Sequence, residues 1–204
     1  MSDRILVTVS GSAGVGKDSV VQEALPRLED LGIGWVRSVV TRPPRPTDDP
    51  SGYTYVDRDA FLHRINDSGI MEFAEVQGEM YGTPSDAFDA GSRGGIKIVT
   101  VDGVRSIRRW MIDHSIHEDR ILSVYLTAPE MVTRRRLRTR GWGDERIDER
   151  RSYDLPGYGT WGVAPDESDI WHLIIENSVR DARFSADILV AAVENLLCSS
   201  SPRP

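Results

Sequence analysis

A glycine-rich segment near the beginning of the chain has the residue types needed to hold phosphate groups. Residues 11–17 read Gly-Ser-Ala-Gly-Val-Gly-Lys, and they lie between an apolar run and a helical pattern. In that position backbone N–H groups converge on phosphate oxygens, and the lysine reaches the β- and γ-phosphates. The segment therefore predicts a P-loop for a nucleoside triphosphate. Its expected binding residues are Gly11, Ser12, Ala13, Gly14, Val15, Gly16, Lys17, Asp18 and Ser19.

The eighth position of this loop departs from the usual pattern. A Ser or Thr hydroxyl normally bonds Mg²⁺ there, whereas this chain has Asp18, followed by Ser19. Successive helical residues point about 100° apart, so Ser19 cannot simply take over the same geometry. Asp18 could instead supply a carboxylate to the metal or to its bound water.

Two arginines three residues apart form a second candidate group. Arg42 and Arg45 lie in the segment 38–46, which also contains three prolines. The fork of an arginine suits a bidentate phosphate, and a stiff backbone lowers the cost of ordering the loop. A solvated loop could have the same composition, so both interpretations stay open on these residues alone.

An α/β arrangement is expected to position these groups. Short apolar runs, typical of buried strands, alternate with helical patterns, which indicates a parallel sheet covered by helices on both faces. The predicted fold class is therefore α/β, a three-layer P-loop NTPase fold with a parallel central sheet. The expected strands are 5–9, 35–40, 96–101, 121–126 and 171–175, and the expected helices after the one that follows the P-loop are 104–112, 129–138 and 182–197.

Two segments interrupt this alternation. Residues 41–95 open with several prolines and continue with short strand-like pieces, which predicts a small inserted α+β subdomain. Residues 141–165 hold five glycines, two prolines and many charges, which favours a mobile lid. We expect one domain over 1–204, with the core in 1–37, 96–138 and 166–198, the insertion in 38–95, the lid in 139–165 and a disordered tail in 199–204.

The composition limits the partners. A net charge of −7 argues against non-specific binding to DNA, RNA or membranes. No apolar run approaches the roughly 20 residues that span a bilayer, and the first residues lack the pattern of a signal peptide. Cys198 is the single cysteine, so no intrachain disulfide is expected. These features predict a cytoplasmic protein that acts on small molecules, and they leave its oligomeric state open.

Together these pieces resemble the guanylate kinase family, in order and with near-matching spacing. The similarity runs from about residue 6 to residue 177 and is most specific between 38 and 84, which includes Gly-Tyr-Thr-Tyr-Val, Met-Glu-Phe-Ala-Glu and Tyr-Gly-Thr-Pro. The resemblance implies an insertion that binds GMP as acceptor. The residues implied to hold its phosphate are Ser38, Arg42, Arg45, Tyr53 and Tyr81, and those implied near its base are Glu72, Thr83 and Asp102. A carboxylate such as Glu72 suits guanine because N1–H and the 2-amino group are both donors.

The resemblance also implies a catalytic set and a metal. Arginines of the lid would neutralise the transferring phosphoryl group, and Mg²⁺ would accompany ATP, the co-substrate. The implied catalytic residues are Lys17, Arg45, Arg136, Arg140 and Arg150. Asp18 and Asp102 would serve the metal, and Asn177 would lie near adenine. The implied reaction is ATP + GMP giving ADP + GDP.

Some positions differ from the family pattern. Thr100 stands where the family usually has the first of two aspartates, so our hypothesis is that Asp18 replaces the charge missing at Thr100. The Lys-Asp-Ser triplet at 17–19 also resembles the ribose 1,5-bisphosphate phosphokinases, which makes a kinase of another phosphorylated small molecule or nucleotide an alternative. A second alternative is a non-catalytic guanylate-kinase-like binding module. Lys17, Arg136 and Arg140 argue against it, because such modules lose these residues.

Overall fold

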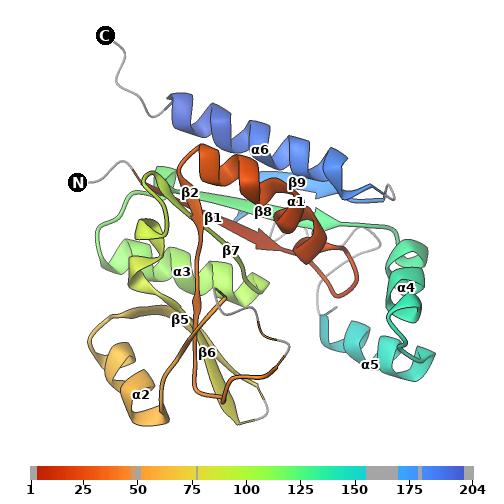
Figure 1. The fold of residues 1–204 in the computed structure, drawn as a ribbon, viewed down its shortest axis with the longest axis horizontal. Helices are drawn as coiled ribbons and strands as arrows, with labels where there is room; N and C mark the ends of the chain where they lie inside the picture. Colours follow the sequence, from red (N-terminus) through yellow and green to blue (C-terminus); the bar gives the residue numbers. More distant parts are fainter. Residues whose placement is uncertain are drawn as a thin grey trace. The chain divides into compact units, whose positions relative to one another are not determined.

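The chain forms two compact units, which are described separately. The computed structural model describes residues 4–46, 48, 52–76, 78–154, 170–178 and 181–199. The first unit comprises Met1–Thr8 and Glu29–Ile121, and the second comprises Val9–Leu28 and Leu122–Pro204. Strand β1 (Ile5–Ser10) begins in the first unit and ends in the second, and the five-stranded sheet has the order β2-β7-β1-β8-β9 (Figure 1).

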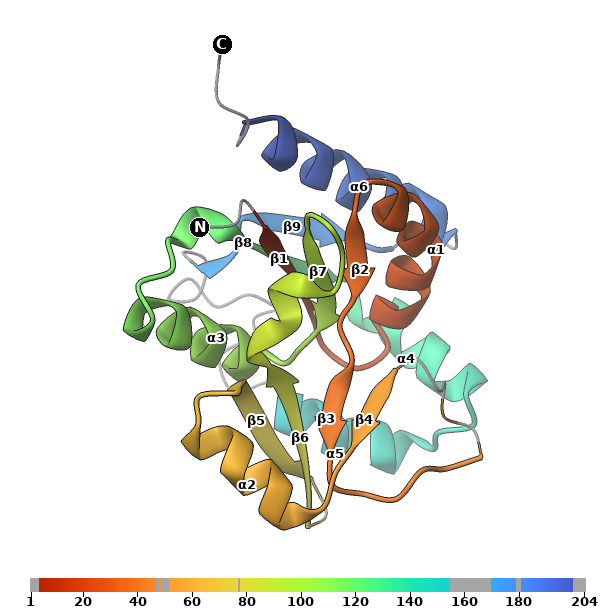
Figure 2. The same cartoon turned by 60° about the vertical axis from the view of Figure 1, so that its left-hand side comes forward.

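The first unit carries a second, four-stranded sheet in the order β4-β3-β6-β5 (Figure 2). Strands β3 and β4 are parallel, whereas β6 is antiparallel to both β3 and β5. Val39, Phe61, Ile70 and Met80 form the buried cluster between this sheet and α2. The elements of this unit besides β1 are β2 (Ile33–Trp35), β3 (Ser38–Val40), β4 (Tyr53–Tyr55), α2 (Arg58–Asn66), β5 (Ile70–Val76), β6 (Glu79–Pro84), η1 (Ser85–Asp89), β7 (Gly94–Ile98), α3 (Val101–Asp113) and η2 (Glu118–Arg120).

The second unit contains the helices that follow the P-loop and the last strands. Strands β8 and β9 are parallel, and every residue of β8 is buried, as expected for a strand covered on both faces. Helices α1 and α6 lie side by side in both views, and Arg27 of α1 forms an ion pair with Asp187 of α6 (Figures 1 and 2). The elements are α1 (Lys17–Asp30), β8 (Ile121–Thr127), α4 (Glu130–Thr139), α5 (Asp144–Asp154), β9 (Leu173–Glu176) and α6 (Ala182–Ser199).

The prediction of a single strand over 35–40 is wrong. The run contains the end of β2, which pairs with β7, and all of β3, which pairs with β4 and β6. The backbone N–H of Val36 still donates to the carbonyl of Ile96 in the first sheet, whereas that of Ser38 donates to the carbonyl of Gly52, the residue before β4. The chain therefore changes sheet within two residues, and this change needs no Gly or Pro between the strands.

The prediction that a strand continues to residue 101 is also wrong. Strand β7 ends at Ile98, and Thr100 is the N-cap of α3, because its hydroxyl accepts a 3.0 Å hydrogen bond from the backbone N–H of Gly103. Asp102 consequently lies in the first turn of a helix and not at a strand end. The residue that replaces the family's first aspartate thus has a structural task of its own.

Part of the predicted lid is a regular helix. Among the side chains of α5 that the structure describes, Ile147 is fully buried, and most of the others are charged. It is bound to α4 by ion pairs of Arg134 with Asp148 and of Arg138 with Asp144. These contacts between helices, rather than an apolar stripe, explain why the glycine- and charge-rich sequence is helical.

The remaining predictions on chain organisation fall partly outside the described residues. Lid residues 155–165 and tail residues 200–204 lie there, while Ser199 is the last residue of α6 and not part of a disordered tail. Cys198 is an exposed free cysteine. No helix among the described ranges has the length and hydropathy needed to cross a membrane.

Candidate functional site

The nine predicted P-loop residues form one turn that leads from the end of β1 into the first turn of α1. The ammonium of Lys17 donates to the carbonyl oxygens of Gly11 at 2.7 Å and Ser12 at 3.1 Å, so it lies over the loop. Asp18 and Ser19 are exposed on the first turn of the helix. The loop therefore presents a cation and a helix N-terminus together, which is the arrangement that binds phosphate.

Two side chains hold the P-loop from outside. The carbonyl oxygen of Val15 accepts hydrogen bonds from Arg136 Nη1 at 2.9 Å and from Asn177 Nδ2 at 2.7 Å. Asn177 is 2% exposed, and its Oδ1 accepts from the hydroxyl of Ser185 at 2.9 Å. Both ends of the Asn177 amide are thus occupied, and its clearest task is to support the loop.

Gly16 is the P-loop position where a side chain is least compatible with this support. Its φ is +97°, and a Cβ there would lie 2.7 Å from Asn177 Nδ2. Gly16→Ala is therefore expected to reduce the free energy of unfolding by about 1–3 kcal/mol, through backbone strain and displacement of the amide. Chemical denaturation followed by circular dichroism measures the change.

Gly143→Ala is the matched control for this substitution. A Cβ at Gly143 would have no heavy atom within 4 Å, and the backbone there is not left-handed. The control is expected to unfold like the unmodified protein. Equal stability of the two variants would contradict the role given to Gly16.

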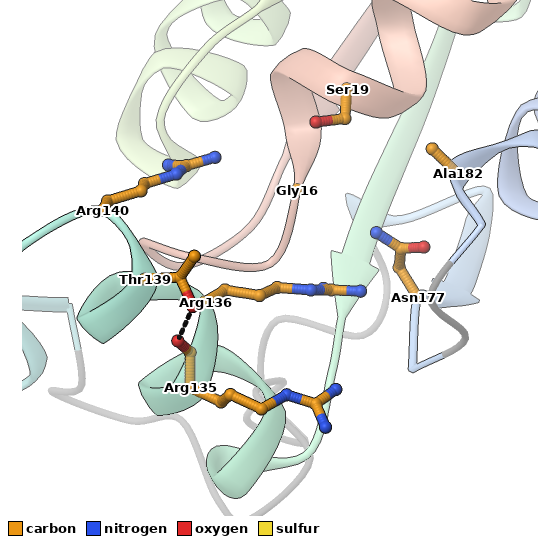
Figure 3. Close-up of a pocket in the computed structure, with 8 residues that line it drawn as sticks. All are labelled: Gly16, Ser19, Arg135, Arg136, Thr139, Arg140, Asn177 and Ala182. Atoms are coloured by element: carbon orange, nitrogen blue, oxygen red, sulfur yellow. Dashed lines mark hydrogen bonds between the residues drawn. The ribbon is translucent and has the colours of Figure 1, made fainter.

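A pocket of about 530 Å³ opens beside the P-loop (Figure 3). It is lined by Gly16, Ser19, Arg135, Arg136, Thr139, Arg140, Asn177 and Ala182. Figure 3 shows the guanidinium of Arg136 extending from α4 between the loop and Asn177. Burial lowers the pKa of Arg136, and the charges of Arg135 and Arg140 lower it further. A site that concentrates cations at this cost favours an anionic ligand.

The lid arginines differ in their placement. Arg136 and Arg140 line this pocket, as does Arg135, which the sequence did not single out. Arg150 is exposed on α5, and it is not one of the described residues that line the pocket. Arg135 could have been found only from its position one residue before Arg136, in a helix where several arginines follow each other.

Arg42 of the predicted acceptor site is buried in an ion pair. Its guanidinium makes a bidentate contact with Asp48, with Nη1 and Nη2 at 2.6 and 2.8 Å from the carboxylate oxygens. The carboxylate also accepts from the Tyr55 hydroxyl and from the backbone N–H of Arg45, each at 2.7 Å. The hydrogen bond from Arg42 holds the pKa of Asp48 well below its usual range. The guanidinium also lies 4.7 Å from the ring centre of Tyr53, and its pKa is raised chiefly by the hydrogen bond to Asp48 and to a smaller extent by Tyr81.

The other predicted acceptor residues form a second group in the same unit. Glu72 Oε1 accepts a 2.5 Å hydrogen bond from the hydroxyl of Thr83, and burial raises the pKa of Glu72. Ser38 accepts from Lys97, a buried residue on β7. Arg45 has an exposed side chain on the loop of Arg42.

Asp102 is placed differently from this group. Its carboxylate is 88% exposed and bonds Arg105 of the same helix at 2.6 Å. The neighbouring Gly103 lies close to Glu72, since a Cβ there would be 3.4 Å from Glu72 Oε2. The beginning of α3 is thus near the predicted base-binding carboxylate, while Asp102 itself faces solvent.

Lys97 is the residue that reasoning from the sequence missed. Its side chain is buried at 4% exposure, and Nζ donates to Ser38 Oγ at 2.7 Å and to the carbonyl of Val36 at 3.4 Å. Burial lowers its pKa to about 8, against the opposing influence of Glu72. A single lysine inside an apolar strand was the available signal, because a buried cation needs partners.

Comparisons with known proteins agree with this geometry. The family model described as guanylate kinase matches residues 3–152. A guanylate kinase from Rubrobacter xylanophilus is 30% identical over 151 residues, which cover 72% of this chain and 74% of that protein. One from Alkalilimnicola ehrlichii is 36% identical over 151 residues, with 72% and 70% covered.

A solved structure extends the likeness to the fold. Guanylate kinase from Anaplasma phagocytophilum superposes with a TM-score of 0.57 at 21% identity, covering 99% of this chain and 88% of that one. The family model and the relatives, which cover most of the sequence, thus show the family that the sequence resembles. The chain belongs to the guanylate kinase family.

Proposed function

We propose that the protein transfers the γ-phosphoryl group of ATP to GMP and releases ADP and GDP. The observation that carries the acceptor assignment is the pair Glu72–Thr83. Thr83 uses its only hydroxyl proton on Glu72, so both side chains offer only lone pairs to a ligand. Guanine presents two donors on one edge, N1–H and the 2-amino group, whereas the N1 of adenine is an acceptor.

The second unit would bind ATP. Lys17 would leave the carbonyl oxygens of Gly11 and Ser12 for the β- and γ-phosphates, and the pocket arginines Arg136 and Arg140 would balance the charge of the phosphate chain. With ATP and GMP as substrates, we expect the protein to act in the cytoplasm on small molecules, without a DNA or RNA partner.

The first unit would bind the phosphate of GMP. Its proposed contacts are Ser38, Arg42, Arg45, Tyr53 and Tyr81. Arg42 would bind phosphate while it is paired with Asp48, whereas Arg45 has an exposed guanidinium on the same loop. We therefore assign Arg42 to fixing the acceptor and Arg45 to the charge that develops during transfer.

Positioning and charge account for the proposed catalysis. The acceptor oxygen of GMP is already anionic near neutral pH, so the reaction needs no dedicated general base. Attack on the γ-phosphorus then depends on alignment of the two substrates and on cations around the transferring group. We assign those cations to Lys17, Arg45, Arg136, Arg140 and Arg150, of which Arg150 is the one assigned from the family pattern alone.

Magnesium fits the residues at the start of α1. Asp18 offers an exposed carboxylate and Ser19 an exposed hydroxyl there, and hard oxygen ligands are those that Mg²⁺ takes. In the described part of the chain, no group of three or more His, Cys, Asp and Glu side chains is arranged to hold a metal. When bound, the metal would neutralise phosphate charge.

Asp18→Ser is expected to raise the Mg²⁺ concentration needed for half-maximal ADP formation by about tenfold, because one charged ligand is lost. Titration of activity with Mg²⁺ at saturating ATP measures the effect. Asp113→Ser, which removes an exposed carboxylate on α3, is the control and should leave the titration unchanged. An Asp18 variant that titrates like this control refutes the assignment.

A coupled assay of ADP release tests the proposed reaction. The acceptors are GMP, dGMP, IMP, AMP, UMP and ribose 1,5-bisphosphate, each at matched concentration. We expect GMP to be used best and IMP, which lacks the 2-amino group, less well. Preference for ribose 1,5-bisphosphate would establish the sugar-phosphate alternative, and absence of ADP with every acceptor would favour a binding module.

A further inference from the structure

Lys97 occupies a position that no part of the proposed reaction yet uses. It lies on β7. Its ammonium donates to the carbonyl of Val36, which follows β2, and to the hydroxyl of Ser38, which begins β3. The 204-residue sequence contains two lysines, Lys17 of the P-loop and Lys97. Burying the charge of a lysine costs free energy unless the ammonium is paired or hydrogen-bonded.

The hydrogen bond to Ser38 determines what that hydroxyl can do. Lysine is a donor only, so the oxygen of Ser38 must accept the 2.7 Å bond. The hydroxyl proton of Ser38 is then free to point to another acceptor. An anionic phosphate oxygen is the strongest acceptor that the proposed reaction would bring to this residue.

The charge of Lys97 also acts on Glu72. Burial raises the pKa of this carboxyl and so favours its protonated form, whereas the hydrogen bond from Thr83 and, after it, the positive charge of Lys97 oppose that effect. A protonated Glu72 would present a donor where guanine also presents donors. The ammonium therefore favours the ionised form of Glu72, which can accept from N1–H and the 2-amino group.

We propose that Lys97 is a positioning residue for the acceptor, which orients the Ser38 hydroxyl toward the GMP phosphate and keeps Glu72 a carboxylate toward the base. This inference rests on the proposed function, because it names a further determinant of the same acceptor site. Lys97 acts through Ser38 and Glu72 and does not itself touch the reacting atoms. Its loss should raise KM for GMP much more than it lowers kcat.

The position of Lys97 makes acceptor binding sensitive to alkaline pH. With a pKa of about 8, the ammonium is charged at lower pH and loses its proton as the pH rises through that value. Glu72 on β5 is the ionised group whose charge acts on Lys97, while the groups that face it from Val36 and Ser38 are neutral. Loss of the proton leaves a neutral amine that can accept the hydroxyl proton of Ser38 and turn it away from the phosphate, so KM for GMP should increase with pH.

Kinetics of Lys97→Met test the proposal. Methionine keeps a similar length without charge, and KM for GMP is expected to rise about tenfold near pH 7 with kcat changed less than about threefold. In the unmodified enzyme KM should rise between about pH 7 and pH 9.5, whereas in the variant it should stay high throughout, so the two converge. Substrate ionisation affects both enzymes equally. Parallel pH profiles of KM would refute the proposal.

Arg109→Met provides the matched control, since Arg109 is an exposed cation on α3, 78% accessible. It should show the KM and the pH profile of the unmodified enzyme. Failure of the proposed function has a different signature, namely no ADP from GMP with the unmodified enzyme. The two outcomes are therefore separate.

Lysine NMR tests the same residue without a variant that might misfold. Protein labelled with ¹³C at the lysine ε-carbons should give two signals, and Lys17→Arg identifies the one that belongs to Lys17. The Lys97 signal is expected to titrate near pH 8, and GMP should move its midpoint upward because the bound phosphate favours the ammonium. A midpoint near the ordinary value of about 10.4 that GMP does not change would overturn the proposal.

Discussion

Lys17→Ala is expected to lower kcat for GMP phosphorylation about 10³-fold, the largest effect of any single substitution considered for this chain. The ammonium is the P-loop cation that would follow the charge of the γ-phosphoryl group during transfer. It also donates to the carbonyl oxygens of Gly11 and Ser12, so some loop order is lost with it. Steady-state ADP release at saturating ATP and GMP measures kcat.

Thermal unfolding separates the two effects of this substitution. We expect the Lys17 variant to unfold within a few degrees of the unmodified protein, since its hydrogen bonds to Gly11 and Ser12 are local contacts within the loop. Arg109→Ala serves as a control for removal of a cation and should retain full activity. Turnover of the Lys17 variant within about tenfold of normal would be incompatible with the P-loop assignment.

Glu72→Gln is expected to reduce kcat/KM for GMP about 10²-fold. The amide oxygen of glutamine can still accept the bond from Thr83, but its NH₂ group then faces the guanine donors. Two charge-assisted hydrogen bonds are lost, and a repulsive contact between donors replaces one of them. The loss should be smaller for AMP, which does not offer N1–H.

Glu75→Gln is the matched control for this experiment. Glu75 lies on the same strand as Glu72, but its side chain is 50% exposed and pairs with Arg58. Its replacement should leave the ratio of kcat/KM for GMP over AMP unchanged. If the Glu72 and Glu75 variants show the same ratio as the unmodified enzyme, Glu72 does not select guanine.

The predictable parts of the fold are those in which a continuous apolar run in the sequence forms a strand that is buried along its length. β1 and β8 are buried along their whole length, so their apolar runs are continuous and easy to recognise. The P-loop adds glycines with positive φ at 11, 14 and 16, which few other turns require together. Helix α6 was expected over 182–197 and ends two residues later.

The errors arose where contacts between distant segments decide the structure. The division of 35–40 into β2 and β3 follows from pairing with two different sheets, which the local sequence does not record. The helix over Asp144–Asp154 has Ile147 as a buried anchor and forms ion pairs with α4. A charged segment that follows glycines gives little indication of such contacts between helices.

The candidate site shows the same limit. Glu72 and Thr83 were expected from the family pattern, and their mutual hydrogen bond is a tertiary contact across β5 and β6. A lysine inside an apolar strand marks Lys97 in the sequence, but its contact with Ser38 of another strand is shown only by the fold. Arg42 was expected to be available for phosphate, whereas the fold gives it an internal carboxylate, Asp48.

The loop that holds Arg42 also holds the counter-ion of this arginine, Asp48. Asp48 neutralises Arg42 before a ligand arrives, and the Tyr55 hydroxyl holds that carboxylate in place. A phosphate that binds Arg42 joins an occupied network and displaces few mobile ions from solution. We therefore expect phosphate binding at Arg42 to depend more on the shape of the incoming anion than on ionic strength.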